Sequence, residues 1–339
     1  TTNELVPASL RNWGFTNIHT VPEQSIPDGD FPTVASANPE EPAAFKMALD
    51  LARKIDADLA MACDPDGDRI GIAVKNDAGE WTLLNGNQTN IIFTEYIIRR
   101  KKELNQLKGG EYTVKTIVTT ELIKDSAEKN HIICYDVYTG FKWIADVIRK
   151  EGGEKFIGGG EESFGYMPGA FTRDKDGVSA TSLMAEIAAW VKMQNKTLYS
   201  FLKEIYAKYG FSQERMIYIV RKGLSGAQEI KAMMEEFRHN TPKEINHSPV
   251  VLKKDYLSLE ATNLQTGEKT HLNFETKSDV LQFFLADGSK ISVRPSGTEP
   301  KIKFYFEARA QMKDMNDYER VQQDANARID AIIKDLKLQ

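Results

Sequence analysis

Cysteine is scarce in this sequence, with Cys63 and Cys134 as the two examples in 339 residues. Two isolated cysteines are too few for a disulfide framework or a zinc site, so the sequence favours a reducing compartment. No run of about 18 apolar residues occurs, and no basic segment leads into an apolar one, which predicts neither a membrane span nor a signal peptide. We therefore expect a soluble, cytoplasmic protein with no membrane partner.

The sequence also lacks a basic excess. The 44 Lys and Arg residues are outnumbered by 49 Asp and Glu residues, which gives a net charge of −5. Proteins that bind nucleic acid usually concentrate basic side chains on one face, so nucleic acid is not an expected partner. With 12 prolines and 41% hydrophobic residues, the composition excludes a disordered or fibrous chain.

Hydrophobic periodicity divides the chain into three expected domains. Residues 1–84 combine a helix with short strands on either side of an acidic loop. Residues 85–209 alternate helices with short β-rich runs, and this order predicts parallel strands. Residues 210–339 predict several strands, one of them over 250–259, and a closing amphipathic helix over 314–336. The expected fold class is α/β, with two mixed or parallel α/β sandwich domains followed by a C-terminal α+β domain with a mainly antiparallel sheet.

Three carboxylates, Asp64, Asp66 and Asp68, alternate with Pro and Gly on a tight loop. Their like charges converge, which raises their pKa values unless a cation lies between them, and a hard divalent metal is the natural cation. An acidic turn in solvent is the plain alternative. A helix-loop-helix calcium site is disfavoured because Arg69 occupies its sixth position and Lys75 its twelfth, where Gly and Glu are required. We favour Mg²⁺.

A glycine-rich cluster over 158–165 follows a predicted strand. Glycines allow a close approach of the backbone, while Glu161 and Ser163 offer hydrogen-bonding groups that suit the hydroxyls of a sugar. Glycine runs are also common in ordinary turns, so this cluster is weak by itself. Lys175 follows within the charged stretch 173–177, where it is either solvated or available as a proton donor or phosphate contact.

Two further loops could bind an anion. Lys142 lies beside a predicted helix N-terminus, where free N–H groups favour negative charge, although an ordinary turn with an exposed lysine is an equal alternative. The second loop, predicted over residues 294–300, contains Arg294, Ser296, Gly297 and Thr298. These groups could form a cradle for a phosphate dianion, whereas a simple hairpin loop would also use Pro and Gly here.

These clusters, in this order, make the sequence resemble the α-D-phosphohexomutase superfamily, which contains phosphoglucomutases, phosphomannomutases and phosphopentomutases. The resemblance covers essentially the whole chain. Residues 64–69 look like the metal loop of the family, 160–163 like its sugar-binding loop and 294–298 like its phosphate-binding loop. It implies Mg²⁺ as the cofactor, a phosphorylated sugar as the substrate and three loops that face a common cleft.

The resemblance also implies a role for each candidate residue. The metal ligands would be Asp64, Asp66 and Asp68, and the catalytic residues would be Arg69, beside the transferring phosphoryl group, together with Lys142 and Lys175. Sugar hydroxyls would contact Glu161 and Ser163, while the phosphate that does not react would be anchored by Arg294, Ser296, Gly297 and Thr298.

Family members transfer a phosphoryl group from a phosphoserine to a sugar phosphate and form a bisphosphate that returns the other phosphoryl group. That serine stands in the first domain of the family, in a Thr-Ala-Ser-His-Asn-Pro type of motif. Ser36-Ala37-Asn38-Pro39 is similar but lacks the His, and it resembles an Asn-Pro-Glu segment of the second domain instead. We therefore expect these residues to match the last three domains of the family and to lack mutase turnover by themselves.

Two details narrow the branch. Phe164 and Gly165 follow the sugar loop where bacterial phosphomannomutases tend to carry His, and the stretch 173–177 resembles phosphoglucomutases and phosphopentomutases. We favour a hexose phosphoglucomutase, with a phosphopentomutase, a phosphomannomutase or a non-catalytic phosphosugar-binding relative as alternatives. Neither the preferred sugar nor the oligomeric state follows from these motifs.

Overall fold

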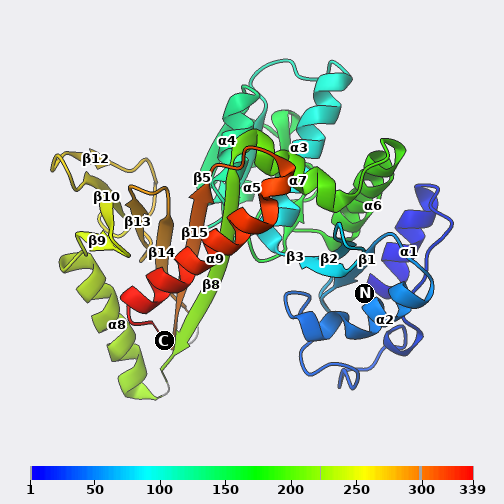
Figure 1. Ribbon diagram of the computed structural model, residues 1–339, viewed down its shortest axis with the longest axis horizontal. Helices are drawn as coiled ribbons and strands as arrows, with labels where there is room; N and C mark the ends of the chain where they lie inside the picture. Colours follow the sequence, from blue (N-terminus) through cyan, green and yellow to red (C-terminus); the bar gives the residue numbers. More distant parts are fainter. Residues whose placement is uncertain (1, 222, 298–299, 339) are drawn as a thin grey trace. The chain divides into compact units, whose positions relative to one another are not determined.

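The computed structural model describes residues 2–221, 223–297 and 300–338 (Figure 1). The chain forms two compact units, Thr1–Tyr209 and Gly210–Gln339. Both cysteines are free thiols, in line with the expected absence of a disulfide. Among the described residues, no helix is long and apolar enough to cross a membrane.

The first part of unit 1 is a three-stranded antiparallel sheet, in the order β1-β2-β3, with helices packed against it. Its small core joins Phe45 and Ala52 to Ala60 and Ala73 of the sheet. A tight turn, with Asn76 N donating to Glu80 O at 2.8 Å, joins the second strand to the third. The elements are α1 (Thr2–Asn12), η1 (Pro22–Gln24), η2 (Pro42–Phe45), α2 (Lys46–Lys54), β1 (Ala60–Cys63), β2 (Ile70–Lys75) and β3 (Trp81–Leu84).

The second part of unit 1 is a four-stranded sheet between helices. The strand order is β5-β4-β6-β7, with β4 parallel to β5 and β6 and with β7 antiparallel at the edge. The elements are α3 (Gly86–Glu103), β4 (Tyr112–Thr116), α4 (Leu122–Lys129), β5 (Ile133–Val137), α5 (Phe141–Glu151), η3 (Gly153–Lys155), β6 (Phe156–Gly160), β7 (Tyr166–Met167), α6 (Gly177–Met193) and α7 (Leu198–Tyr209).

Two apolar clusters show that this sheet is covered on both faces. On one side, Phe141, Ile144 and Ile148 of α5 pack against the strands. A second cluster joins Ile98 of α3 and Ala127 of α4 to Ile157 of β6. Parallel strands are usually covered on both faces, because the helices that connect one strand to the next pack against the sheet. The sandwich architecture expected from the sequence is therefore confirmed.

Unit 2 is built on one antiparallel sheet in the order β12-β11-β10-β13-β14-β15-β8, with β9 paired to β10. Helix α8 packs on β14 and β15, and α9 packs on β8 and β15. Its elements are β8 (Phe211–Val220), α8 (Leu224–His239), β9 (Glu244–Ile245), β10 (Ser248–Asp255), β11 (Glu260–Asn263), β12 (Lys269–His271), β13 (Leu281–Leu285), β14 (Lys290–Pro295), β15 (Lys301–Ala310), η4 (Met315–Asp317) and α9 (Tyr318–Asp335). This confirms the expected α+β domain.

The strand predicted over 250–259 was wrong in its length. It ends at Asp255, and a separate strand begins at Glu260. The Asp255 carboxylate accepts a hydrogen bond from Leu257 N at 3.0 Å, and Leu259 has a φ of 59°. A side-chain bond to the backbone two residues on and a left-handed residue both favour a turn, which interrupts the apolar run.

Glu95 is fully buried among the helices of unit 1 and forms an ionic network. Its carboxylate accepts hydrogen bonds from Arg99 Nε at 2.7 Å, Ser126 Oγ at 2.8 Å, Lys208 Nζ at 3.0 Å and Tyr209 Oη at 2.8 Å. Burial by itself raises the pKa of Glu95, but the hydrogen bonds from Arg99, Ser126 and Lys208 outweigh it, so the pKa lies below its usual value. The network ties α3, α4 and α7 together.

Replacing Glu95 with Gln is expected to lower the free energy of unfolding of unit 1 by about 2 kcal/mol at pH 7, because two cations lose a buried charged partner. A lowered folded-state pKa means that the stabilisation is present above the unfolded pKa of about 4.3 and is lost as the pH falls through the folded value. Urea unfolding should therefore show a constant difference from wild type above about pH 5 and a shrinking one below about pH 4. Glu128→Gln, on the surface of α4, is the control and should stay within about 0.5 kcal/mol.

Candidate active site

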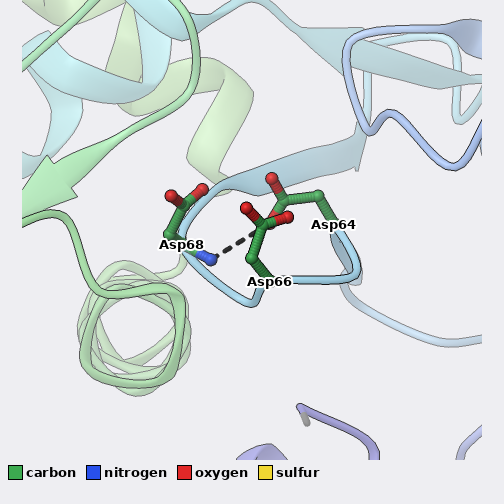
Figure 2. A group of neighbouring side chains, drawn as sticks. All are labelled: Asp64, Asp66 and Asp68. Carbon is green, nitrogen blue, oxygen red and sulfur yellow. Dashed lines mark hydrogen bonds between the residues drawn. The ribbon is translucent and has the colours of Figure 1, made fainter.

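The acidic loop joins β1 to β2 and is closed by its own first carboxylate (Figure 2). Asp64 Oδ1 accepts hydrogen bonds from Asp68 N at 3.0 Å and from Arg69 N at 3.1 Å. The backbone turns at Gly67, which has a φ of 75° and whose N–H donates to Asp64 O at 3.0 Å. This closure places the three aspartates on a single turn.

The structure brings Asp64, Asp66 and Asp68 together as the sequence predicts. One carboxylate oxygen from each lies within 4.8 Å of the others, with Asp64 buried and Asp66 exposed. Burial is the largest cause that raises the pKa of Asp64, and the charge of Asp68 adds to it. Asp68 Oδ1 is buried and has no hydrogen-bond partner among the described residues. A compact set of oxygen ligands with one buried oxygen lacking a donor fits a hard divalent cation such as Mg²⁺.

Two cationic side chains contact this loop. Arg69 Nη1 donates to Glu40 Oε1 at 3.1 Å, and its Nε lies 3.5 Å from Asp64 Oδ2. Lys175 Nζ donates to Asp68 Oδ2, although 107 residues separate the two in the chain. The structure therefore places two of the predicted catalytic candidates at the acidic loop.

Glu40 was not predicted as a site residue, yet its carboxylate accepts a hydrogen bond from Arg69. Its own backbone is fixed, because Glu40 N donates to Asn38 Oδ1 at 3.1 Å and Pro39 is buried. The Asn-Pro-Glu segment was a signal for this position, but the contact itself depends on tertiary packing that spans 29 residues.

Residues 161–165 of the glycine-rich cluster form a short loop between β6 and β7, while residues 158–160 belong to β6. Glu161 N donates to Gly165 O at 3.0 Å, which closes the loop with Ser163 near its tip. The Glu161 carboxylate accepts a hydrogen bond from Gly140 N, at the start of α5. The Glu162 carboxylate accepts hydrogen bonds from Thr116, the last residue of β4, and from Thr119 in the turn that follows it. The two glutamates thus reach turns at the carboxyl ends of two neighbouring parallel strands.

Backbone hydrogen bonds connect the acidic loop to the glycine-rich loop and to the Lys175 segment. Ile70 N donates to Phe164 O at 3.0 Å, and Gly177 N donates to Gly67 O at 3.0 Å. A Cβ added to Gly177 would lie 2.6 Å from Gly67 O, so this approach requires glycine. The acidic loop therefore meets, within unit 1, two segments that lie far from it in the sequence.

Lys142 stands apart from these contacts. It is exposed on the first turn of α5, and its Nζ lies 5.0 Å from the centre of the Trp143 ring. The turn before it, however, reaches the glycine-rich loop through Gly140. A place for Lys142 in the chemistry stays a prediction.

The candidate phosphate loop belongs to unit 2. Arg294 was expected in this loop but lies in β14, paired with Lys303 of β15, because the two strands continue their register to that point. Ser296 N donates to Lys301 O at 2.7 Å, which closes the connection, and Gly297 is exposed. Thr298 lies outside the described residues.

Comparison with known proteins finds the same family in all three parts of the chain. Phosphoglucomutase/phosphomannomutase family models match as α/β/α domain II over residues 1–79, as α/β/α domain III over 85–209 and as the C-terminal domain over 229–324. A phosphoglucomutase of Staphylococcus aureus (strain N315) is 36% identical over 326 residues, which is 96% of this chain and 57% of that protein. The chain thus spans little more than half the length of this curated relative.

Solved structures show the same fold at lower identity. A putative phosphomannomutase from Thermus thermophilus matches with a TM-score of 0.54 at 18% identity. The match covers 89% of this chain and 50% of the phosphomannomutase chain. The open form of pp63/parafusin, a phosphoglucomutase from Paramecium, has a TM-score of 0.55 at 17% identity, with 85% and 50% covered.

Proposed function

Because this chain belongs to the phosphoglucomutase/phosphomannomutase family, we propose that it carries the metal, sugar and phosphate sites of a mutase that interconverts the 1-phosphate and the 6-phosphate of glucose. The observation that carries the proposal is the meeting of the acidic loop, Lys175 and the glycine-rich loop through the contacts of Asp68, Gly67 and Phe164. The name of the Staphylococcus aureus relative supports glucose as the sugar.

We assign the residues of the chain to the following roles. Asp64, Asp66 and Asp68 would hold Mg²⁺, which supplies positive charge beside the phosphoryl group in transfer. Arg69, held by Glu40, orients that phosphoryl group, and Lys175 acts as a general acid that donates a proton to the oxygen that leaves phosphorus. Sugar hydroxyls are bound by Glu161 and Ser163.

The remaining phosphate is anchored in unit 2 by Arg294, Ser296, Gly297 and Thr298. A guanidinium fork beside hydroxyl and backbone donors suits a dianionic phosphate. The transfer proceeds through a phosphoserine and a bisphosphorylated sugar, and no Ser-His-Asn-Pro sequence occurs among these 339 residues. We therefore expect the 339-residue chain to bind the sugar phosphate without turning it over.

Calorimetry and a coupled assay test this function. In the presence of Mg²⁺, the 339-residue chain is expected to bind glucose 6-phosphate more tightly than mannose 6-phosphate or ribose 5-phosphate, and to show no turnover. The native protein should convert glucose 1-phosphate faster than it converts mannose 1-phosphate or ribose 1-phosphate. Preference for mannose or ribose phosphates would overturn the choice of glucose, and absence of binding to all three would overturn the mutase assignment.

A further inference from the structure

Glu162 stands between two residues that the proposed function places on the sugar, and its carboxylate bonds to the end of β4 and the turn after it. Its Oε2 accepts hydrogen bonds from Thr116 Oγ1 at 3.2 Å and from Thr119 Oγ1 at 3.1 Å. Both threonines are completely buried. A carboxylate that accepts two bonds from buried hydroxyls is held in one orientation, because these donors have fixed positions and charge-assisted bonds are strong.

The turn that supplies these donors is itself rigid. Thr119 N donates to Thr116 O at 3.1 Å. Beneath the turn, the fully buried Lys115 donates to Thr116 O at 3.3 Å and to Thr119 O at 3.4 Å. The Lys115 ammonium also lies 2.7 Å from Asp136 Oδ1. The turn is therefore fixed by backbone and ionic contacts that do not involve the glycine-rich loop.

The loop above the turn needs external support. Phe164 has a φ of 68°, a left-handed conformation that costs a residue with a side chain about 1–2 kcal/mol. Such conformations persist only where the surrounding structure determines them. The loop backbone is also held by Asn90 Nδ2, which donates to Glu161 O at 2.8 Å. The contacts of Glu162 and Asn90 thus stabilise a loop conformation that its local sequence disfavours.

We propose that Glu162 does not bind the sugar but positions the sugar-binding loop, with Thr116 and Thr119 as its buried anchor. This inference rests on the proposed function. With Glu162 fixed, its neighbours Glu161 and Ser163 keep a single arrangement before the sugar arrives, so that binding does not have to order the loop. Thr116, Thr119 and Glu162 are positioning residues and not catalytic ones.

The test measures the affinity of the 339-residue chain for glucose 6-phosphate by calorimetry in the presence of Mg²⁺. Thr116→Val keeps the shape of the side chain and removes the hydroxyl, and it should weaken binding about threefold to tenfold. Thr116→Ser keeps the hydroxyl and should bind like wild type. Glu162→Ala should weaken binding about tenfold or more, and the double variant Glu162→Ala with Thr116→Val should be no weaker than Glu162→Ala.

Thr113→Val is the matched control, because Thr113 is a buried threonine of the same strand whose hydroxyl donates to Gly158 O, in β6 and outside the loop over 161–165, at 2.7 Å and not to Glu162. It should leave glucose 6-phosphate binding unchanged. Mg²⁺ affinity, measured separately, should be unchanged in all variants. A purely structural role would lower the melting temperature of Thr113→Val and Thr116→Val alike, without a selective loss of sugar phosphate binding.

The outcomes separate the two proposals. If wild type does not bind glucose 6-phosphate, the proposed function fails. If wild type binds and Thr116→Val binds equally well, or if Thr116→Ser is as weak as Thr116→Val, the positioning role is overturned. Additive losses in the double variant would also overturn it, since they would mean that Thr116 and Glu162 act independently of each other. Should Glu162→Ala fail to fold, the comparison of Thr116→Val with Thr116→Ser still decides.

Discussion

Asp66→Asn is expected to lower mutase turnover of the native protein about a thousandfold, because charge stabilisation by a bound divalent ion contributes several kcal/mol to phosphoryl transfer. In the 339-residue chain, Mg²⁺ affinity should fall in parallel. Asp66 is the exposed member of the acidic cluster, whereas Asp64 also closes the loop with its two accepted hydrogen bonds. The effect of Asp66→Asn on binding is therefore not mixed with a collapse of the loop.

Asp58→Asn provides the comparison for charge alone. Asp58 is an exposed carboxylate of unit 1 that pairs with Lys192 at 2.7 Å, outside the acidic cluster. Its removal should leave Mg²⁺ affinity and turnover within about twofold of wild type, because exposed ion pairs contribute little. Calorimetry with Mg²⁺ and a coupled turnover assay measure both variants. Retention of normal Mg²⁺ affinity in Asp66→Asn would remove Asp66 from the proposed ligand set.

Gly86→Ala is expected to destabilise unit 1 by at least about 3 kcal/mol and to weaken glucose 6-phosphate binding tenfold or more. A Cβ at Gly86 would lie 1.9 Å from Glu162 O, a backbone atom that cannot move without displacing the glycine-rich loop. Helix propensity acts in the opposite direction, since Ala in a helix gains up to about 1 kcal/mol over Gly. The sign of the measured change therefore tells which effect dominates.

Gly29→Ala controls for the substitution itself, because a Cβ at Gly29 would meet no heavy atom within 4 Å. Urea unfolding should place this control within about 0.5 kcal/mol of wild type. A stabilised Gly86→Ala variant with intact sugar phosphate binding would show that the loop is able to move away from α3 without loss of function.

The local pattern of apolar and polar residues was sufficient to predict much of the fold. The alternation of helices and β-rich runs over 85–209 predicted the parallel strands β4, β5 and β6, whereas the short antiparallel edge strand β7 was not predicted. Helix α7 was not predicted, although Leu198, Phe201, Leu202 and Ile205 have helical spacing and are buried. The strand expected over 250–259 was wrong in length because a side-chain turn at Asp255 outweighed the β-rich pattern of this stretch.

The candidate site was predictable where its residues are adjacent in the chain. Asp64, Asp66 and Asp68 share one turn, so their clustering follows from spacing alone. The contacts of Glu40 with Arg69 and of Glu162 with Thr116 could not be predicted in the same way, because each joins segments that only the folded backbone brings together. A glutamate that turns inward also has the same letter in the sequence as one that faces a ligand.

Two main-chain hydrogen bonds, from Ile70 to Phe164 and from Gly177 to Gly67, have a consequence for building hybrids with related enzymes. Backbone groups form such hydrogen bonds only when both segments keep their backbone conformation. In a hybrid joined near residue 84, the two bonded segments would come from different parent proteins, and their backbone conformations would have to be compatible. A splice at residue 209 keeps both bonds within one parent. The portable module is thus the whole of residues 2–209, even though two family domains divide it in sequence.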